Sequence, residues 1–361
     1  MRICIDLTSL ADNFSGIERF ALSITKELIR NKEIEWILLF KNYVHKEFCK
    51  TEKNVKKIVI KGKNKLLFNQ VKLPLKLLEI DADKFFFPAF PAPFFFFNKN
   101  AFNTIHDLSC WDCPESNKLH MILYFKLMYW KASLNQKKII TVSEFSKKRI
   151  CEILRSRPEN VSVIYNGIDQ KFYHKNITKN ILKKYNIPEK FFLCLSTLEP
   201  RKNLQLLIRA YSKVCEDINV NLVLAGRKGW LVENILSDLP SNVKNKIYFT
   251  GFIEEDDLPI IYKNALWFIF PSLYEGFGIP PLEAMATGTP VLSSDAASMP
   301  EILGDAAIYF NSNDEIDLLK HLKCIAHIEK TEEMKAKCID RASLYSWEKS
   351  AEKLIDLFCE L

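Results

Sequence analysis

The sequence lacks several signatures that mark common classes of protein. No G-x-G-x-x-G follows the first expected strand and no P-loop sequence occurs, which argues against a nicotinamide dehydrogenase and an ATPase. No Asp-x-Asp is placed to hold a metal ion, and the C-x-x-C from Cys110 to Cys113 has no second pair that would complete a zinc site. The ten cysteines have no regular spacing, which indicates buried thiols rather than disulfide bridges.

Long hydrophobic runs and clustered charge are also scarce. The longest apolar stretch, Phe85–Phe97, is too short to span a bilayer and holds three prolines. We expect a strand at Lys84–Phe87 and then a proline-rich loop, which either fills a core or lies near a lipid. The net charge of +7 suits an anionic partner, such as a nucleotide diphosphate or a membrane surface. The lysines are dispersed and do not alternate with aromatic residues, so no nucleic-acid partner is expected.

The chain is long enough for two domains, because 361 residues exceed the size at which one core usually suffices. It begins with an expected strand and no signal peptide, which favours the cytoplasm. The first βα unit combines a strand at Ile3–Asp6, a loop through Gly16, and a helix with Phe20, Ile24 and Leu28 on one face. A second series of strands is expected at Phe191–Leu195, Asn221–Gly226, Ile247–Gly251 and Trp267–Phe270. The alternation predicts an α/β protein with two doubly wound sheets.

The most informative stretch runs from Tyr274 to Glu283. Before it, Leu266–Pro271 is an unbroken apolar run, typical of a strand buried on both faces of a parallel sheet. The pair Pro280-Pro281 suits the first turn of a helix, and Gly288 suits its end. Strand, glycine loop and helix therefore follow in that order. This arrangement places backbone N–H groups and a helix N-terminus at the carboxyl edge of a strand, where anionic ligands bind.

Charged residues with complementary chemistry accompany this turn. We expect Glu275 on the loop and Glu283 on the first helical turn, both within reach of one ligand, and carboxylates accept hydrogen bonds from sugar hydroxyls. Arg201 and Lys202 follow a strand and suit diphosphate oxygens. Adjacent residues on a helix diverge by about 100°, so both reach one ligand only from a loop. The pattern indicates a nucleotide-sugar site, although Glu283 alone could simply complement a helix dipole.

A basic amphipathic helix is expected at residues 65–80. Phe68, Val71, Leu75 and Leu78 share its apolar face, and Lys61, Lys65, Lys72 and Lys76 form a stripe nearby. Such a helix binds an anionic membrane or presents an ordinary solvated face, and Pro74 is expected to kink it. The sequence leaves both readings open.

The run from Tyr274 to Glu283, continued through Val291, closely resembles the E-x7-E signature of retaining glycosyltransferase family 4. The segment Ser196–Leu204 resembles the basic diphosphate-binding segment of that family, in the form seen in bacterial mannosyltransferases that build O-antigen chains. The family often has a further arginine upstream, where this chain has Ser196 and Thr197. Other matches occur in the family's order along nearly the whole chain, at Ser15–Arg19, Ile105–Leu108, Thr141–Ser146, Asn166–Asp169 and Thr250–Ile253.

The resemblance implies the GT-B fold, with two doubly wound Rossmann-like domains facing a cleft. We expect an acceptor-binding domain at residues 1–170, a nucleotide-sugar-binding domain at 171–345, and a C-terminal helix at 346–361 that packs back on the first domain. The sequence supports this helix independently. After a serine cap at Ser346, the residues Trp347, Ala351, Ile355 and Phe358 recur at helical spacing.

The resemblance also implies roles in the second domain. Arg201 and Lys202 would stabilise the leaving diphosphate, and Glu283 would bind the ribose hydroxyls. Ile253 would contact the base through its main chain. Glu275 would hydrogen-bond the donor sugar. It would be helped by the backbone N–H groups of Gly276, Phe277, Gly278 and Ile279. Because fixed cations replace a metal here, we expect metal-independent transfer and no cofactor.

In the first domain, the resemblance places His106 against the donor sugar near the reacting centre. Gly16, at the start of the first helix, would let the backbone approach the diphosphate. The alternatives are a structural histidine and a simple glycine turn. The sequence points to no catalytic nucleophile.

The expected function is transfer of a hexose, with mannose from GDP-mannose favoured, to a lipid-linked or polysaccharide acceptor in the synthesis of a bacterial surface glycan such as O-antigen or capsule. The enzyme would be cytoplasmic and peripheral on the cytoplasmic membrane. Two alternatives remain: a nucleotide-sugar epimerase of the same fold, and an inactive partner subunit of a polysaccharide assembly complex. The sequence does not choose the nucleobase, the acceptor or the linkage.

Overall fold

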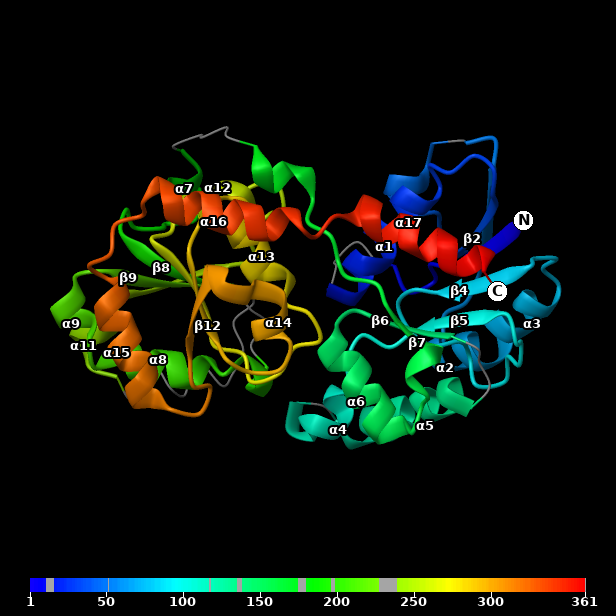
Figure 1. Cartoon of the computed structure of the whole chain (residues 1–361), viewed down its shortest axis with the longest axis horizontal. Coiled ribbons are helices and arrows are strands. Elements are labelled where there is room, and N and C mark those ends of the chain that lie inside the picture. The colour runs from blue at the N-terminus through cyan, green and yellow to red at the C-terminus, as the bar shows by residue number, and fades with distance from the viewer. Residues whose placement is uncertain are drawn as a thin grey trace. The chain divides into compact units, whose positions relative to one another are not determined.

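A computed structural model of the chain describes residues 1–10, 16–50, 52–116, 118–134, 138–174, 180–195, 199–226 and 239–360 (Figure 1). These residues form two compact units. The first unit comprises Met1–Gly167 and Ser346–Leu361, and the second comprises Ile168–Tyr345. The predicted α/β class with two doubly wound parallel sheets is confirmed. Among the described helices, none is both long and apolar enough to cross a membrane.

The first unit is built on a parallel sheet of seven strands in the order β3-β2-β1-β4-β5-β6-β7. Its strands are β1 (Arg2–Asp6), β2 (Glu35–Lys41), β3 (Val55–Ile60), β4 (Lys84–Phe87), β5 (Ala101–Thr104), β6 (Lys138–Thr141) and β7 (Val161–Val163). Its helices are α1 (Gly16–Leu28), α2 (Lys65–Leu67), α3 (Leu73–Leu78), α4 (Ser109–Asp112), α5 (Leu119–Leu134), α6 (Glu144–Leu154) and α17 (Trp347–Cys359). The order of the strands reverses between β1 and β4, so the sheet is doubly wound.

The second unit has a parallel sheet of six strands in the order β10-β9-β8-β11-β12-β13. Its strands are β8 (Phe191–Leu195), β9 (Asn221–Ala225), β10 (Ile247–Gly251), β11 (Trp267–Phe270), β12 (Val291–Ser294) and β13 (Ala307–Phe310). Its helices are α7 (Asn180–Lys184), α8 (Leu204–Ser212), α9 (Cys215–Ile218), α11 (Ser241–Lys244), α12 (Leu258–Asn264), α13 (Ile279–Ala286), α14 (Met299–Leu303), α15 (Glu315–Ile325) and α16 (Glu332–Ser343).

Short 3₁₀ turns complete the described structure. They are η1 (Lys46–Phe48), η3 (Pro114–Ser116) and η4 (Pro158–Asn160) in the first unit, and η5 (Gln170–Tyr173), η6 (Pro200–Lys202) and η7 (Gly304–Ala306) in the second. The turn η6 carries Arg201 and Lys202, the basic pair predicted to bind the diphosphate.

The C-terminal helix α17 returns to the first unit, as predicted. Ser346 caps the helix by accepting a hydrogen bond from the Lys349 N–H, 3.1 Å from its Oγ. The ring of Trp347 packs edge-on against Phe20 of α1, and that of Phe358 packs edge-on against Phe102 of β5. Gly167 makes this possible, because a Cβ there would come within 2.1 Å of the backbone nitrogen of Trp347. The last helix therefore completes the core of the first unit.

The predicted helix at residues 65–80 exists, but the prediction of its buried face is correct only for Phe68. Its middle turn, η2 (Phe68–Lys72), is a π-helix between α2 and α3. A π-turn holds more residues than an α-turn and rotates the following residues around the axis. The buried residues are Phe68, Leu73 and Leu77, whereas Val71, Leu75 and Leu78 are exposed. Three of the four residues on the predicted face therefore point to solvent, and only Phe68 packs inward.

Candidate functional site

The second unit brings its predicted site residues to one place in the sheet. Chain order reverses between the neighbouring strands β8 and β11, and ligands of open α/β sheets bind outside the carboxyl ends of the strands at such a reversal. The turn η6, with Arg201 and Lys202, follows β8, and the loop with Glu275 follows β11. Residues 196–198 of the same motif lie outside the described part of the chain.

Arg201, Lys202 and Glu275 form one ion-paired cluster at this point. The Nζ of Lys202 lies 2.5 Å from Oε1 of Glu275, and Nη1 of Arg201 lies 3.2 Å from Oε2. The hydroxyl of Ser272 also donates to Oε1, at 2.8 Å. Two adjacent basic residues therefore reach the same carboxylate from a 3₁₀ turn, although the sequence analysis expected this only from a loop.

Electrostatics keep Glu275 ionised although its side chain is only 11% exposed. Burial by itself raises the pKa of this carboxyl, but the charges of Lys202 and Arg201 outweigh burial and hold the pKa below its usual value. Arg201 also pairs with Glu199 at 2.8 Å. These two cations and two carboxylates balance, so no net charge is left buried. The cluster can release positive charge to a ligand only by reorganising these pairs.

Backbone contacts fix the loop that carries Glu275. The N–H of Leu273 donates to the carbonyl oxygen of Arg201 at 2.7 Å, which joins this loop to η6. The hydroxyl of Ser298 lies 3.0 Å from the carbonyl oxygen of Glu275 and 3.2 Å from that of Phe277. Sequence reasoning missed Ser272 and Ser298. Isolated serines carry no pattern, and only the folded chain shows which carbonyl or carboxylate each one reaches.

The helix α13 begins at Ile279, after Gly278 with a φ of +95°. Its proline pair and the stop at Gly288, with a φ of +77°, lie as predicted. Glu283 is the exception, because it lies on the second turn rather than the first. It is 2% exposed, and the hydroxyl of Tyr262 donates to its Oε2 at 3.0 Å. A buried, bonded Glu283 thus ties α13 to α12.

The remaining donor-site candidates of the second unit lie on the same edge of the sheet. Ile253 is buried just after β10, which is separated from β8 by β9. Gly276 and Phe277 lie on the loop after β11, and the Phe277 ring packs edge-on against Tyr345 at 5.5 Å between centroids. The ring of Phe277 is 3% exposed and is therefore part of the core.

The first unit holds His106 and Gly16. His106 follows β5 and is 7% exposed; its Nε2 lies 2.9 Å from the carbonyl oxygen of Pro88, and its ring packs edge-on against Phe20. Since a carbonyl only accepts, Nε2 carries the proton. Burial lowers the pKa of His106 to about 4, against the opposing effects of the Pro88 bond and Asp107. The imidazole is therefore neutral near pH 7.

Gly16 and Asp6 flank the strand reversal of the first sheet, between β1 and β4. A Cβ at Gly16, the first residue of α1, would meet no atom within 4 Å, so the helix start is open on that side. Asp6 ends β1 and accepts a hydrogen bond from the Thr8 N–H at 3.0 Å, and burial raises the pKa of its carboxyl. The sequence analysis did not single out Asp6, because one acid at a strand end carries no motif.

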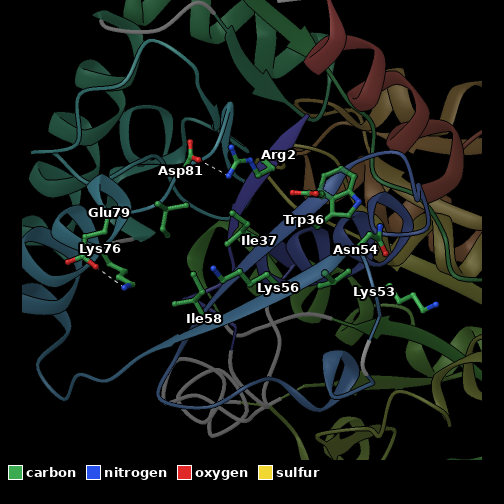
Figure 2. A pocket seen from close by; sticks show the side chains of 13 residues that line it. Arg2, Trp36, Ile37, Lys53, Asn54, Lys56, Ile58, Lys76, Glu79 and Asp81 are labelled. Atoms are coloured by element: carbon green, nitrogen blue, oxygen red, sulfur yellow. Dashed lines mark hydrogen bonds and ion pairs between the residues drawn. The ribbon is translucent and has the colours of Figure 1, made fainter.

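A cavity of about 440 Å³ lies elsewhere in the first unit (Figure 2). It is lined by Arg2, Glu35 and Val55, the first residues of β1, β2 and β3, so it opens at the amino edge of the sheet. Figure 2 shows Arg2 paired with Asp81, and Lys76 paired with Glu79. None of the predicted site residues lines it. The cavity is therefore separate from the carboxyl edge, where the candidate site lies.

Comparison with known proteins decides the class. Residues 177–344, which include the whole ion-paired cluster, match the family described as "Glycosyl transferases group 1". The chain contains a glycosyl transferases group 1 domain. The predicted enzyme class, a glycosyltransferase, is thereby confirmed.

Curated relatives of this glycosyltransferase extend the match. The chain is 26% identical to O-antigen chain mannosyltransferase B of Escherichia coli, over 99% of both chains. It is 32% identical to O-antigen chain mannosyltransferase RfbU of Salmonella typhimurium, over 60% of this chain and 58% of that protein.

Solved structures confirm the GT-B fold of the glycosyltransferase. Sucrose-phosphate synthase from Thermosynechococcus elongatus superimposes with a TM-score of 0.76 at 16% identity, over 99% of this chain and 98% of that one. Anabaena HepE, solved in complex with UDP and glucose, superimposes with a TM-score of 0.75 at 18% identity over the whole of both chains. At such identities the likeness speaks for the fold alone.

Proposed function

We propose that this glycosyltransferase moves a hexose, with mannose favoured, from a nucleotide diphosphate sugar to a lipid-linked or polysaccharide acceptor during the synthesis of a bacterial surface glycan. The observation that carries the proposal is the cluster of Arg201, Lys202 and Glu275 at the strand reversal of the second sheet. Full-length similarity to an O-antigen chain mannosyltransferase supports mannose and this class of acceptor. We take GDP-mannose as the first donor to test.

The chemistry follows from the charges of the cluster. As the bond between the anomeric carbon and the β-phosphate oxygen of the donor breaks and the acceptor oxygen bonds to that carbon, the departing nucleoside diphosphate gains negative charge. Preorganised cations at that position lower the barrier. Arg201 offers a planar fork to phosphate oxygens and Lys202 a compact charge. Once they turn to the diphosphate, Glu275 is released to accept hydrogen bonds from the hexose hydroxyls. We propose that transfer proceeds without a metal ion and retains the anomeric configuration by front-face attack.

His106 and the other predicted donor contacts complete the proposal. Neutral His106 holds its Nε2 proton against Pro88, which leaves Nδ1 as the acceptor atom of the ring. Gly16, Ile253, Glu283 and the segment 276–279 would contact the donor as the resemblance implies. The acceptor would bind to the first domain. We also propose that the enzyme works at the cytoplasmic face of the membrane, where it reaches a lipid-linked acceptor.

The test is transfer from a panel of nucleotide-sugars to a lipid-linked acceptor, followed by mass spectrometry of the product and NMR of its anomeric proton. We expect transfer from one nucleotide diphosphate hexose, insensitive to EDTA and with retained configuration. A donor that is converted in the absence of any acceptor would indicate an epimerase. Failure to bind any nucleotide-sugar would refute the proposal.

The chain supplies a matched control for the charged cluster. Arg209 and Lys213 also hold one carboxylate, that of Glu315, at 3.2 Å and 2.6 Å, but on an exposed face of the same unit. Lys202→Ala is expected to lower kcat by about 100-fold, the typical loss when one charge-stabilising donor is removed. Lys213→Ala is expected to leave kcat unchanged. Equal activity of the two variants would contradict the assigned role.

A further inference from the structure

The first domain carries an exposed apolar stripe along α5. Leu119, Leu123, Leu127, Trp130 and Leu134 follow one another at helical spacing, and each is between 49% and 72% exposed. The opposite side of the helix, including Met128 and Ala132, is buried. A helix on the surface of a soluble domain normally presents polar residues outward, whereas this helix is apolar on both sides.

A second exposed stripe lies on the neighbouring helical segment. The π-turn η2 directs Leu67, Val71, Leu75 and Leu78 to solvent, and each is between 44% and 70% exposed. The two helical segments touch, because the amide of Gln70 donates to the hydroxyl of Tyr124 at 3.0 Å. Figure 1 shows α2 near α5 in the first domain. The stripes therefore lie on adjacent helices.

The loop after β4 adds two phenylalanines to these stripes. Phe95 and Phe97 are each 63% exposed. The Nζ of Lys131, a residue only 2% exposed, donates to the carbonyl oxygens of Pro93 at 3.0 Å and Phe96 at 2.6 Å. Since α5 itself anchors the loop through this lysine, the phenylalanines are held next to the α5 stripe. We call the two stripes with Phe95 and Phe97 the docking surface.

The segments that carry the docking surface are rich in lysine, and the one of these lysines nearest to Leu78, Lys76, pairs with Glu79. Residues 61–78 include five lysines and no acidic residue, and no acidic residue occurs between Glu115 and Glu144. Lysines beside exposed Leu, Phe and Trp are typical of surfaces that insert into an anionic bilayer. Protein interfaces are also enriched in aromatic residues, but lysine is depleted from them.

We propose that the docking surface inserts into the interfacial layer of an anionic phospholipid bilayer. Leucine and phenylalanine side chains enter the boundary between head groups and acyl chains, Trp130 lies at head-group depth, and the lysines contact lipid phosphates. This deepens the membrane contact proposed above by naming the surface. It also accounts for the exposure of large apolar side chains, which water would otherwise surround.

The test is co-sedimentation of the full-length protein with vesicles, with no donor or acceptor present. We expect binding to phosphatidylcholine vesicles in which about one third of the lipid is phosphatidylglycerol, and weaker binding as that fraction falls or salt rises. Substituting the exposed residues Leu123, Leu127 and Trp130 together by Gln should weaken partitioning by at least about tenfold. The pair Ile316→Gln and Leu344→Gln, with similarly exposed residues of the second unit, should have no effect.

Depth is tested separately by fluorescence quenching with brominated lipids. Quenching by wild type that is lost in Trp130→Phe, while binding persists, would place Trp130 in the bilayer. The proposal is overturned if wild type does not bind, if the control pair loses as much binding, or if bound Trp130 is not quenched. It is equally overturned if the Gln variant instead abolishes self-association, which would make this face a protein interface. The vesicle experiments do not measure glycosyl transfer, so their outcome is independent of the transfer assay that tests the proposed enzymatic activity.

Discussion

In the proposed reaction, the Glu275 carboxylate exchanges its ion pairs with Arg201 and Lys202 for hydrogen bonds from the hexose hydroxyls. A substitution of Glu275 tests this exchange. In the structure its carboxylate pairs with Arg201 and Lys202, the two cations that the proposed reaction requires to bind the diphosphate. Glu275→Gln removes the competing charge but keeps the shape. We expect tighter binding of the nucleoside diphosphate, measured by calorimetry, together with a loss of kcat of about 100-fold because the hexose loses its acceptor.

The control for this substitution is Glu315→Gln, which alters the exposed cluster with Arg209 and Lys213. Glu315→Gln should change neither the affinity for the nucleoside diphosphate nor kcat. Weaker diphosphate binding by Glu275→Gln would show that the carboxylate serves to order the two cations rather than to compete for them.

His106 gives a prediction for stability against pH. Its pKa is about 4 in the folded protein and 6.5 in the reference state, so the unfolded chain takes up the proton first as pH falls. Stability from the neutral, buried ring is complete above pH 6.5 and is lost between pH 6.5 and about 4. At about 1.4 kcal/mol per unit, the loss reaches about 3 kcal/mol.

Urea denaturation of wild type and His106→Gln at several pH values measures this contribution. The variant should be less stable at pH 7, but its stability should fall less steeply between pH 6.5 and pH 4. Parallel curves for the two proteins would contradict the assignment of a neutral buried imidazole.

At the residue scale, the sequence predicted the charged groups but not what holds them. Arg201, Lys202 and Glu275 were recognisable because charge at a strand end followed by glycine and proline is a local pattern. Ser272 and Ser298 were not: a serine three residues before Glu275 carries no motif, and the hydrogen bond of Ser298 joins segments that only the fold brings together. Lys131 was missed for a related reason. From sequence alone, a lysine on a helix is expected at the surface. Only the structure shows that Lys131 is buried and donates to carbonyl groups of the loop.

At the scale of single elements, the start of α13 links backbone conformation to the site. Gly278 has a φ of +95°, which costs a residue with a Cβ about 1–2 kcal/mol. A Cβ there would also lie 2.5 Å from Cε of Met299, a flexible side-chain end that can move. We expect Gly278→Ala to lower stability by about this amount and also to reduce donor affinity, because the helix start and the Glu275 loop shift together.

Gly288→Ala is the matched control at the other end of α13. Its φ of +77° imposes a similar strain, and its Cβ would make ordinary contact with Lys335 at 3.4 Å. Thermal melting should show comparable destabilisation of the two variants, whereas titration with the nucleotide-sugar should separate them. If donor affinity falls equally in both, the effect is global rather than local to the site.

The helical segment at 65–78 shows where pattern reading fails for an element. Helical periodicity assumes a constant turn, and the π-turn at Phe68–Lys72 breaks that assumption. Spacing alone could not decide which of two apolar faces packs inward, because both contain large aliphatic residues. The strands gave no such difficulty. The four residues of β11 and the three phenylalanines of β4 are continuous apolar runs, and the parallel sheet buries them on both faces.

At the scale of the whole molecule, the alternation of strands and helices in the sequence predicted two doubly wound sheets. Only the structure shows between which strands the order reverses. The sequence could not say that β8 and β11 are neighbours, since this depends on how the sheet is wound. That neighbourhood brings Arg201 and Lys202 to Glu275, although more than 70 residues separate them in the chain. The strand order therefore explains why these residues meet, and the local sequence pattern identified which charged residues they are.

Because α17 packs in the first unit, we expect side chains of this last helix to stabilise the strands of that unit. The Phe358 ring lies 4.9 Å from that of Phe102 and 5.5 Å from that of Phe86, between centroids, and is 1% exposed. Phe358→Ala removes a buried ring and leaves a cavity, a change that costs about 3–5 kcal/mol. Because Phe358 belongs to the first unit, we expect faster amide hydrogen exchange in β4 and β5 and unchanged exchange in β8 and β11.

Phe358→Leu provides the control, since it keeps most of the apolar volume and should cause a smaller change in the same strands. Donor binding offers a second readout. If the second unit folds on its own core, Phe358→Ala should keep its affinity for the nucleoside diphosphate while losing stability in the first unit. Faster exchange in β8 and β11 would instead mean that the two units unfold as one cooperative body, joined through the segment at Tyr345 and Ser346 that connects them.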